Sequence, residues 1–259
     1  MLGFDWNLIE GFLLAFVRIS AALVIMPVFG YTAIPVQAKA GIGFLLAIPL
    51  APVAAISLPY TIYGPLPFFG AVAGEALIGF VIGAASLLML IGSEFAGTLI
   101  GLQMGFSIVN VMDPQQEQEI SIIGRIEYLL ALMVFLALDM HHLLLGALGE
   151  SFVRIPLGVG FFGAEVPILF GRMTADVFII AVKLAAPVLA ILLMVEIALG
   201  FIARAMPQMN VFADSFPLKI GVGMAAMVVT WPLFVYVLSR SFDKFGGDLF
   251  RIVRSMGPP

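Results

Sequence analysis

The chain has 259 residues, of which 62% are hydrophobic and only 11% are charged, and its formal net charge is −4. Soluble domains are about half apolar and about a quarter charged, so this composition excludes an ordinary soluble domain. The acidic balance leaves no basic face for phosphates, so no nucleic-acid partner is expected. Cysteine is absent, which excludes disulfides and thiolate metal sites.

The apolar runs predict an all-α integral membrane protein. Each run is long enough to cross a bilayer, which takes about 20 helical residues, and the dyad alternation of a membrane barrel is missing. Asp5 lies before the first apolar run and Glu10 lies within it, whereas a signal peptide begins with basic residues. We therefore interpret this run as a retained helix rather than a cleaved signal. The predicted helices cover residues 8–29, 38–58, 68–108, 122–147, 166–206 and 216–238.

Two of these segments, 68–108 and 166–206, are much longer than one crossing needs. Each is either one long tilted helix or a bent pair, with the bend near Gly92 in the first and near Pro187 in the second. The tail, residues 240–259, carries the only basic cluster. By the positive-inside tendency we expect this tail to be cytoplasmic.

The chain is expected to form a single domain, residues 1–259, with a faint similarity between residues 18–58 and 198–238. Both parts contain a Met-Pro pair followed by a K-x-G-x-G pattern, at a constant offset. The matches are Met26, Pro27, Lys39, Gly41 and Gly43 with Met206, Pro207, Lys219, Gly221 and Gly223. Either a duplication, as transporters use, or chance in a glycine-rich chain explains the pattern.

Several glycines stand four residues apart, which clears one helix face for a neighbouring backbone. The neighbour is either another helix of this chain or another subunit. The predicted packing or interface glycines are Gly70, Gly74, Gly79, Gly83, Gly97, Gly101, Gly105, Gly221 and Gly223.

Six charged residues lie inside apolar runs, where an unpaired charge costs a few kcal/mol. Buried pairing or subunit contact is the preferred interpretation, and an ion or proton relay is the alternative. The six predicted buried charges are Arg18, Glu75, Glu94, Asp139, Lys183 and Glu196.

The residues Asp139, His141 and His142 raise the possibility of a metal site. Adjacent histidines on a helix point roughly 100° apart and should not converge on one ion, so neither a metal nor a cofactor is expected. No catalytic motif is present, so the chain is predicted not to be an enzyme. An intramembrane enzyme that uses His141 with a carboxylate is a distant alternative.

Residues 101–120, GLQMGFSIVNVMDPQQEQEI, combine an apolar run with the most polar stretch of the chain. Pro114 disfavours helix at the residue before it, so the long helix is predicted to stop by about Met112. The polar part is either an exposed loop or a loop that lines an aqueous path at membrane depth.

Four stretches in order resemble the FliR/SctT family of type III export-gate proteins. They are FVRISAALVIMPVFGYTAIPVQAKAGIGFLLAIPLAP, GLQMGFSIVNVMDPQ, LALDMHHLLLGALGESF and PQMNVFADSFPLKIGVG, which together with the length cover nearly the whole chain. Met140 departs from the glycine expected before the two histidines. The DPQ after the apolar run is closer to the flagellar branch than to the virulence branch.

The resemblance implies long helical hairpins, a FliP-like part followed by a FliQ-like part, in a ring-like gate with FliP and FliQ. It further implies FlhA and FlhB as neighbours, unfolded flagellar proteins as cargo, and a place in the flagellar basal body of the bacterial cytoplasmic membrane, among its lipids. Alternatives are a virulence-system subunit and a secondary transporter for a small solute.

The resemblance also implies a plug loop that obstructs the closed channel. Its apolar side chains would seal the pore, and its polar part would face water. The predicted plug residues are Phe106, Ser107, Ile108, Val109, Asn110, Val111, Met112, Asp113, Pro114, Gln115, Gln116, Glu117 and Gln118.

Overall fold

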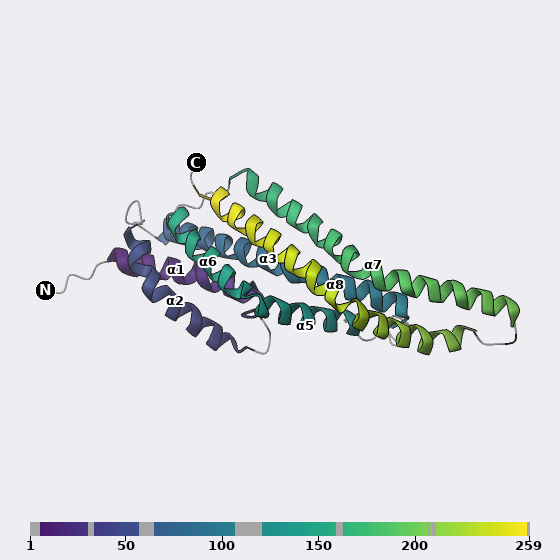
Figure 1. Cartoon of the computed structure of the whole chain (residues 1–259). Coiled ribbons are helices and arrows are strands. Elements are labelled where there is room, and N and C mark those ends of the chain that lie inside the picture. Colours follow the sequence, from purple (N-terminus) through teal and green to yellow (C-terminus); the bar gives the residue numbers. More distant parts are fainter. Residues whose placement is uncertain are drawn as a thin grey trace. The chain divides into compact units, whose positions relative to one another are not determined.

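A computed structural model gives the structure of the chain (Figure 1), and every regular element among the residues it describes is a helix. The described residues are 6–30, 34–56, 65–106, 121–158, 163–206, 208 and 211–257. The helices are α1 (Trp6–Ile25), α2 (Val36–Ile56), α3 (Pro65–Met104), α5 (Ile122–Ala137), α6 (Met140–Arg154), α7 (Glu165–Ala205) and α8 (Val211–Ser255).

Among the residues that the structure describes, four helices are long and apolar enough to cross a membrane, namely α1, α3, α7 and α8, and α5 with α6 form a fifth candidate as one broken span. The predicted all-α class is therefore confirmed, and these helices are compatible with the predicted membrane protein. Both long predicted segments are single helices: α3 has 40 residues and α7 has 41. The alternative of a bent pair is wrong for both, and α7 stays one helix through Pro187.

Two predicted boundaries are wrong. The segment 122–147 is interrupted, because Asp139 adopts a left-handed backbone conformation (φ 54°) between α5 and α6. The basic tail is helical: α8 continues to Ser255 rather than ending at residue 238, since residues 240–255 contain no helix-breaking proline and keep burying apolar side chains.

The end of α3 also differs from the prediction, and glycine is the reason. Gly105 has φ 94°, and its N–H bonds to the carbonyl of Leu102 at 3.1 Å. The next N–H, of Phe106, reaches back to the carbonyl of Gly101 at 3.0 Å. These two bonds form a Schellman motif, which ends the helix at Met104, well before Pro114.

The chain divides into two compact units. Unit 1 comprises Met1–Met89, Asp139–Thr174 and Phe242–Pro259, and unit 2 comprises Leu90–Leu138 and Ala175–Ser241. In unit 1, α3 approaches α1 closely at Gly79 and Gly83, where an added methyl group would meet α1 backbone. Close helix contacts of this kind are typical of small residues in membrane proteins.

In unit 2, α3 approaches α5 in the same way. A methyl group added at Gly97 would lie 2.7 Å from the Cα of Gly124, and one added at Gly124 would lie 3.0 Å from the carbonyl oxygen of Glu94. The rings of Phe95 and Phe178 meet edge to face, with centroids 5.4 Å apart. Small and aromatic residues therefore position α3 against α5 and α7 within this unit.

The two parts of the faint repeat occupy helix–break–helix segments. The first spans the break between α1 and α2 in unit 1, and the second spans the break between α7 and α8 in unit 2. Lys39 donates to the carbonyl of Gly30 at 3.0 Å, and Lys219 pairs with Glu196 at 2.9 Å. Both lysines thus bind back toward the preceding helix or its end, while the duplication itself stays a prediction.

Candidate functional site

The most completely buried charges in unit 1 are Arg18 on α1 and Glu75 on α3. Their side chains are 0% and 1% exposed, and Nε of Arg18 lies 2.5 Å from Oε2 of Glu75. Both were predicted as buried charges from the sequence, but their spacing along the chain did not identify them as partners. Closing the two helices at Gly79 brings the pair together.

The guanidinium of Arg18 has further acceptors from the end of α6. Nη1 donates to the carbonyl of Ser151 at 2.9 Å, and Nη2 donates to the carbonyl of Ile155 at 3.2 Å. The ring of Phe152 stacks on the guanidinium at 4.6 Å. The second oxygen of Glu75 accepts from the N–H of Gly158 at 3.0 Å. This network joins three helices and the turn after α6 around one ion pair.

Removing one partner of a buried, hydrogen-bonded ion pair leaves the other charge uncompensated and costs about 3–5 kcal/mol. The network has no route to a substrate, because both side chains are almost wholly enclosed. Its arrangement therefore serves to fix α1, α3 and α6 relative to one another within unit 1.

Unit 2 contains a buried carboxylate that the sequence analysis missed, Glu127 on α5. Its side chain packs against Gly97, the residue is 5% exposed, and its Oε2 has no hydrogen-bond partner among the described residues. The signal in the sequence was its position inside an otherwise apolar helix, next to Tyr128. Arg125 lies two residues before Glu127 in the sequence. Its guanidinium stacks on the ring of Tyr128.

The other four predicted buried charges are less enclosed. Glu94 is half-buried, whereas Asp139, Lys183 and Glu196 are exposed, so burial within this chain is wrong for those three. Asp139 lies at the break before α6, and the other two lie on different faces of α7. Apolar neighbours in sequence did not reveal which helix faces are covered.

Glu196 belongs to a cluster of three helices in unit 2. Its Oε1 pairs with Nζ of Lys219 on α8 at 2.9 Å, and its Oε2 accepts from Nε2 of Gln103 on α3 at 2.8 Å. Nearby, the side chain of Met104 fills the space over Gly223, and the ring of Phe216 covers Gly105. The cluster and these contacts hold the last turn of α3 against α8.

The predicted packing glycines divide into two groups. Gly79, Gly83, Gly97, Gly101, Gly105 and Gly223 lie at close contacts within the chain. Gly70 and Gly221 face open space, where a side chain would meet nothing within 4 Å. Gly74 is half-buried. The open positions, Gly70 and Gly221, leave room for a helix of another subunit.

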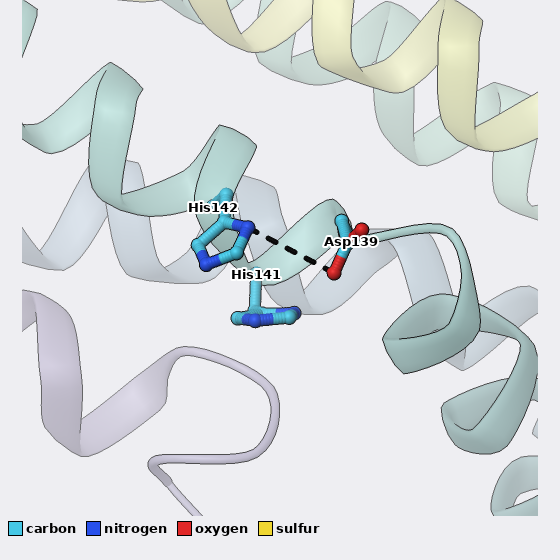
Figure 2. Close-up of side chains that lie close together, drawn as sticks. All are labelled: Asp139, His141 and His142. Atoms are coloured by element: carbon cyan, nitrogen blue, oxygen red, sulfur yellow. Dashed lines mark ion pairs between the residues drawn. The ribbon is translucent and has the colours of Figure 1, made fainter.

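Asp139, His141 and His142 lie closer together than predicted (Figure 2). The two rings have centroids 4.2 Å apart, and the potential ligand atoms of the three residues lie within 4.8 Å of one another. The expectation that the rings diverge is wrong, because both lie in the first turn of α6, where their side chains rotate toward each other. Nδ1 of His142 lies 3.8 Å from Oδ1 of Asp139.

This cluster does not by itself define a metal centre. A zinc ion with bonds of about 2.0–2.1 Å holds its ligand atoms no more than about 4.2 Å apart. Asp139 and His142 are also exposed. The expected absence of a metal stays a prediction.

The predicted plug, residues 106–118, lies outside the described residues except for Phe106. This residue is half-buried and completes the Schellman motif at the end of α3. On the other side, Ser121 caps α5 by accepting from the N–H of Gly124 at 3.0 Å. The intervening segment therefore begins and ends at capped helix termini of unit 2.

Comparison with known proteins supports the resemblance found in the sequence. Residues 9–245 match the family described as bacterial export proteins, family 1. The flagellar biosynthetic protein FliR of Bacillus subtilis (strain 168) is 36% identical over 240 residues, covering 92% of each chain.

Two further relatives bear the same name. The FliR of Pectobacterium carotovorum subsp. carotovorum is 31% identical over 259 residues, 96% of each chain. The FliR of Escherichia coli (strain K12) is 27% identical over 241 residues, 92% of this chain and 91% of the relative. The predicted family is confirmed: this chain belongs to the bacterial export proteins, family 1.

Proposed function

We propose that the chain is a structural subunit of the flagellar protein-export channel in the bacterial cytoplasmic membrane. Its relatives bear the name flagellar biosynthetic protein, and its helices are long and apolar enough to span a membrane. In this role the chain lines a path for unfolded flagellar proteins and carries out no chemistry of its own.

The length of the exposed apolar surface on α3 carries the proposal of a multi-subunit assembly. Leu66 is 82% exposed and Leu102 is 54% exposed, and a rise of about 1.5 Å per residue places them about 54 Å apart along the helix. The hydrocarbon core is only about 30 Å thick. Even a tilt of about 40° leaves about 41 Å along the bilayer normal. Lipid tails therefore do not cover all of this surface, and other protein chains have to cover the rest.

The resemblance implies that those chains are FliP and FliQ, with FlhA and FlhB as neighbours. In this assembly the chain contributes a FliP-like part followed by a FliQ-like part to a helical ring, and its C-terminal end lies in the cytoplasm. A secondary transporter, the alternative suggested by the repeat, would function without these partners.

Within the channel, residues 106–118 form a plug. Apolar side chains such as Ile108, Val109 and Met112 exclude water and ions. Because apolar side chains form neither hydrogen bonds nor ion pairs, a passing chain displaces them. The capped helix ends at Met104 and Ser121 give this segment two fixed attachment points.

The plug is tested by membrane conductance in cells that make the whole complex. Deleting residues 107–117 should raise ion leak across the cytoplasmic membrane, as should replacing Ile108, Val109 and Met112 by serine. The matched control replaces Gln115 and Gln116 by alanine and should leave the leak unchanged. An intact complex with unchanged conductance after the deletion would overturn the plug.

A further inference from the structure

An open cleft lies among α5, α7 and α8 in unit 2. Its volume is about 370 Å³, which is within the range of about 300–1,000 Å³ for small-molecule sites. The α8 side of the cleft extends from Met224 to Val237, about 20 Å along the helix. Apolar side chains form most of the wall, among them Ile126, Leu130, Val188, Met227, Val228 and Trp231.

Two charged residues, Glu127 and Lys183, interrupt this apolar wall. Glu127 is 5% exposed, and its Oε2 has no hydrogen-bond partner among the described residues. A buried polar atom without a partner is costly, so such atoms are normally satisfied by protein, water or a ligand. Oε2 itself is enclosed, but Glu127 lines the cleft, so a hydrogen-bond donor that enters there approaches the carboxylate at its other oxygen, Oε1.

Lys183 supplies the opposite charge. It is exposed on α7 and has no ion-pair partner among the described residues. The hydroxyl of Thr230 also lines the cleft, but it is already bonded to the carbonyl of Ala226 at 2.8 Å. The polar groups that await a partner are thus one carboxylate and one ammonium, which match a ligand that carries both a cation and an anion.

The α8 side of the cleft is largely uncovered. Of the four long candidate spans, α8 is the least buried, with 17% of its apolar window covered. The cleft thus adjoins a surface that hydrocarbon can reach.

We propose that this cleft binds one aminophospholipid, with an acyl chain in the apolar groove. The lipid ammonium donates hydrogen bonds to Glu127, and its phosphate pairs with Lys183. The position of the carboxylate suits a headgroup, since Glu127 lies about 8 Å from the first residue of α5. The residues before that helix, 113–119, are the most polar in the chain. This inference does not depend on the proposed export function.

The test uses the full chain with the subunits that co-purify, in mild detergent. Lipids with identical acyl chains are added, and native mass spectrometry counts those retained. Phosphatidylethanolamine offers a donating ammonium, phosphatidylcholine offers a cation without N–H, and phosphatidylglycerol offers only the phosphate. Wild-type protein should retain the ethanolamine lipid about tenfold better than the choline lipid, as expected for one charge-assisted hydrogen bond.

Variants assign the effect to the cleft. Glu127→Gln should abolish the preference for the ethanolamine lipid, and Lys183→Gln should lower retention of all three lipids. Val228→Trp fills the groove and should do the same. The matched control is Glu196→Gln, a carboxylate outside the cleft on the same unit, and it should change nothing.

The proposal is overturned if the wild type retains the ethanolamine and choline lipids equally, or if Glu127→Gln keeps the preference. A photoreactive benzoylphenylalanine at position 229, which is exposed on α8 beside the cleft but does not line it, gives a second measurement in cells. A cross-link to lipid supports the proposal, whereas a cross-link to another protein subunit or to a second copy of this chain overturns it.

Discussion

Each unit buries a glutamate, and the two carboxylates differ in what surrounds them. Glu75 in unit 1 meets Arg18 and the N–H of Gly158, so both of its oxygens are satisfied within the chain. Glu127 in unit 2 has an oxygen without a partner among the described residues and lies on the wall of an open cleft. The first carboxylate links helices, and the second is available to something outside the chain.

This difference shows why burial alone does not define a functional site in a membrane protein. A charge that neighbouring helices satisfy contributes to the fold, and changing it should cost stability. A buried charge that the chain leaves unsatisfied costs stability already, so its presence points to a ligand or partner. Breaking the ion pair of Glu75 and replacing Glu127 should therefore change the free energy of unfolding in opposite directions.

The largest effect is expected at the ion pair of unit 1. Arg18→Met leaves the carboxylate of Glu75 buried without a cation, which should lower the free energy of unfolding by about 3–5 kcal/mol. Thermal unfolding of the purified protein in detergent measures the loss. The double variant Arg18→Met, Glu75→Leu removes both charges and should recover most of it. A double variant as unstable as the single one would show that the pair is not the cause.

Next in size is the close approach of α3 and α5 in unit 2. Gly97→Ala places a methyl group 2.7 Å from the Cα of Gly124, where backbone rather than a flexible side chain has to move. We expect a loss of about 1–3 kcal/mol. Gly221→Ala is the matched control, since nothing lies within 4 Å of that position. Equal melting temperatures for the two variants would contradict the close contact.

At Glu127 the substitution is expected to raise the free energy of unfolding rather than lower it. Glu127→Met replaces an unsatisfied buried carboxylate by an apolar side chain of similar length, which should stabilise the protein by about 1–3 kcal/mol in detergent without added lipid. Adding the ethanolamine lipid should reduce the difference in stability between the variant and the wild type, because the lipid stabilises only the wild type. A variant that is less stable than the wild type under both conditions would show that the chain satisfies this carboxylate itself.

The smallest effect is expected at the partly exposed pair of unit 2, in which the side chain of Lys219 is 14% exposed. Lys219→Ala removes the contact with Glu196, whose side chain is 50% exposed. Water-exposed pairs contribute about 0–1 kcal/mol, so the melting temperature should change little and the change should shrink at high salt. A loss comparable to that at Arg18 would place this pair in a non-aqueous environment.

Much of the fold could be predicted from the sequence because apolar runs of membrane length leave few alternatives to helices. The positions of the helix ends were harder to predict. Pro114 gave an obvious stop signal, but Gly105 ends α3 first, since its backbone and that of Phe106 complete the Schellman bonds. The break at Asp139 could not be predicted, because no glycine or proline lies beside it in the sequence.

The functional residues were predictable as residue types but not as partners. Arg18 and Glu75 are far apart in sequence, and only the packing of α1 on α3 brings them together. Glu127 was missed because the covered face of α5 depends on Gly97 in another helix. The family resemblance, in contrast, rested on ordered local motifs, and the comparisons confirm it.

The central claim is that this chain is one subunit of a multi-protein channel, and co-purification tests it most directly. An affinity tag on the chain expressed from its native locus, followed by mild solubilisation and mass spectrometry, identifies its stable partners. The account predicts a complex in which the chain occurs together with FliP and FliQ. A stable chain that purifies alone, or only as a homo-oligomer, and binds a small solute would contradict the claim.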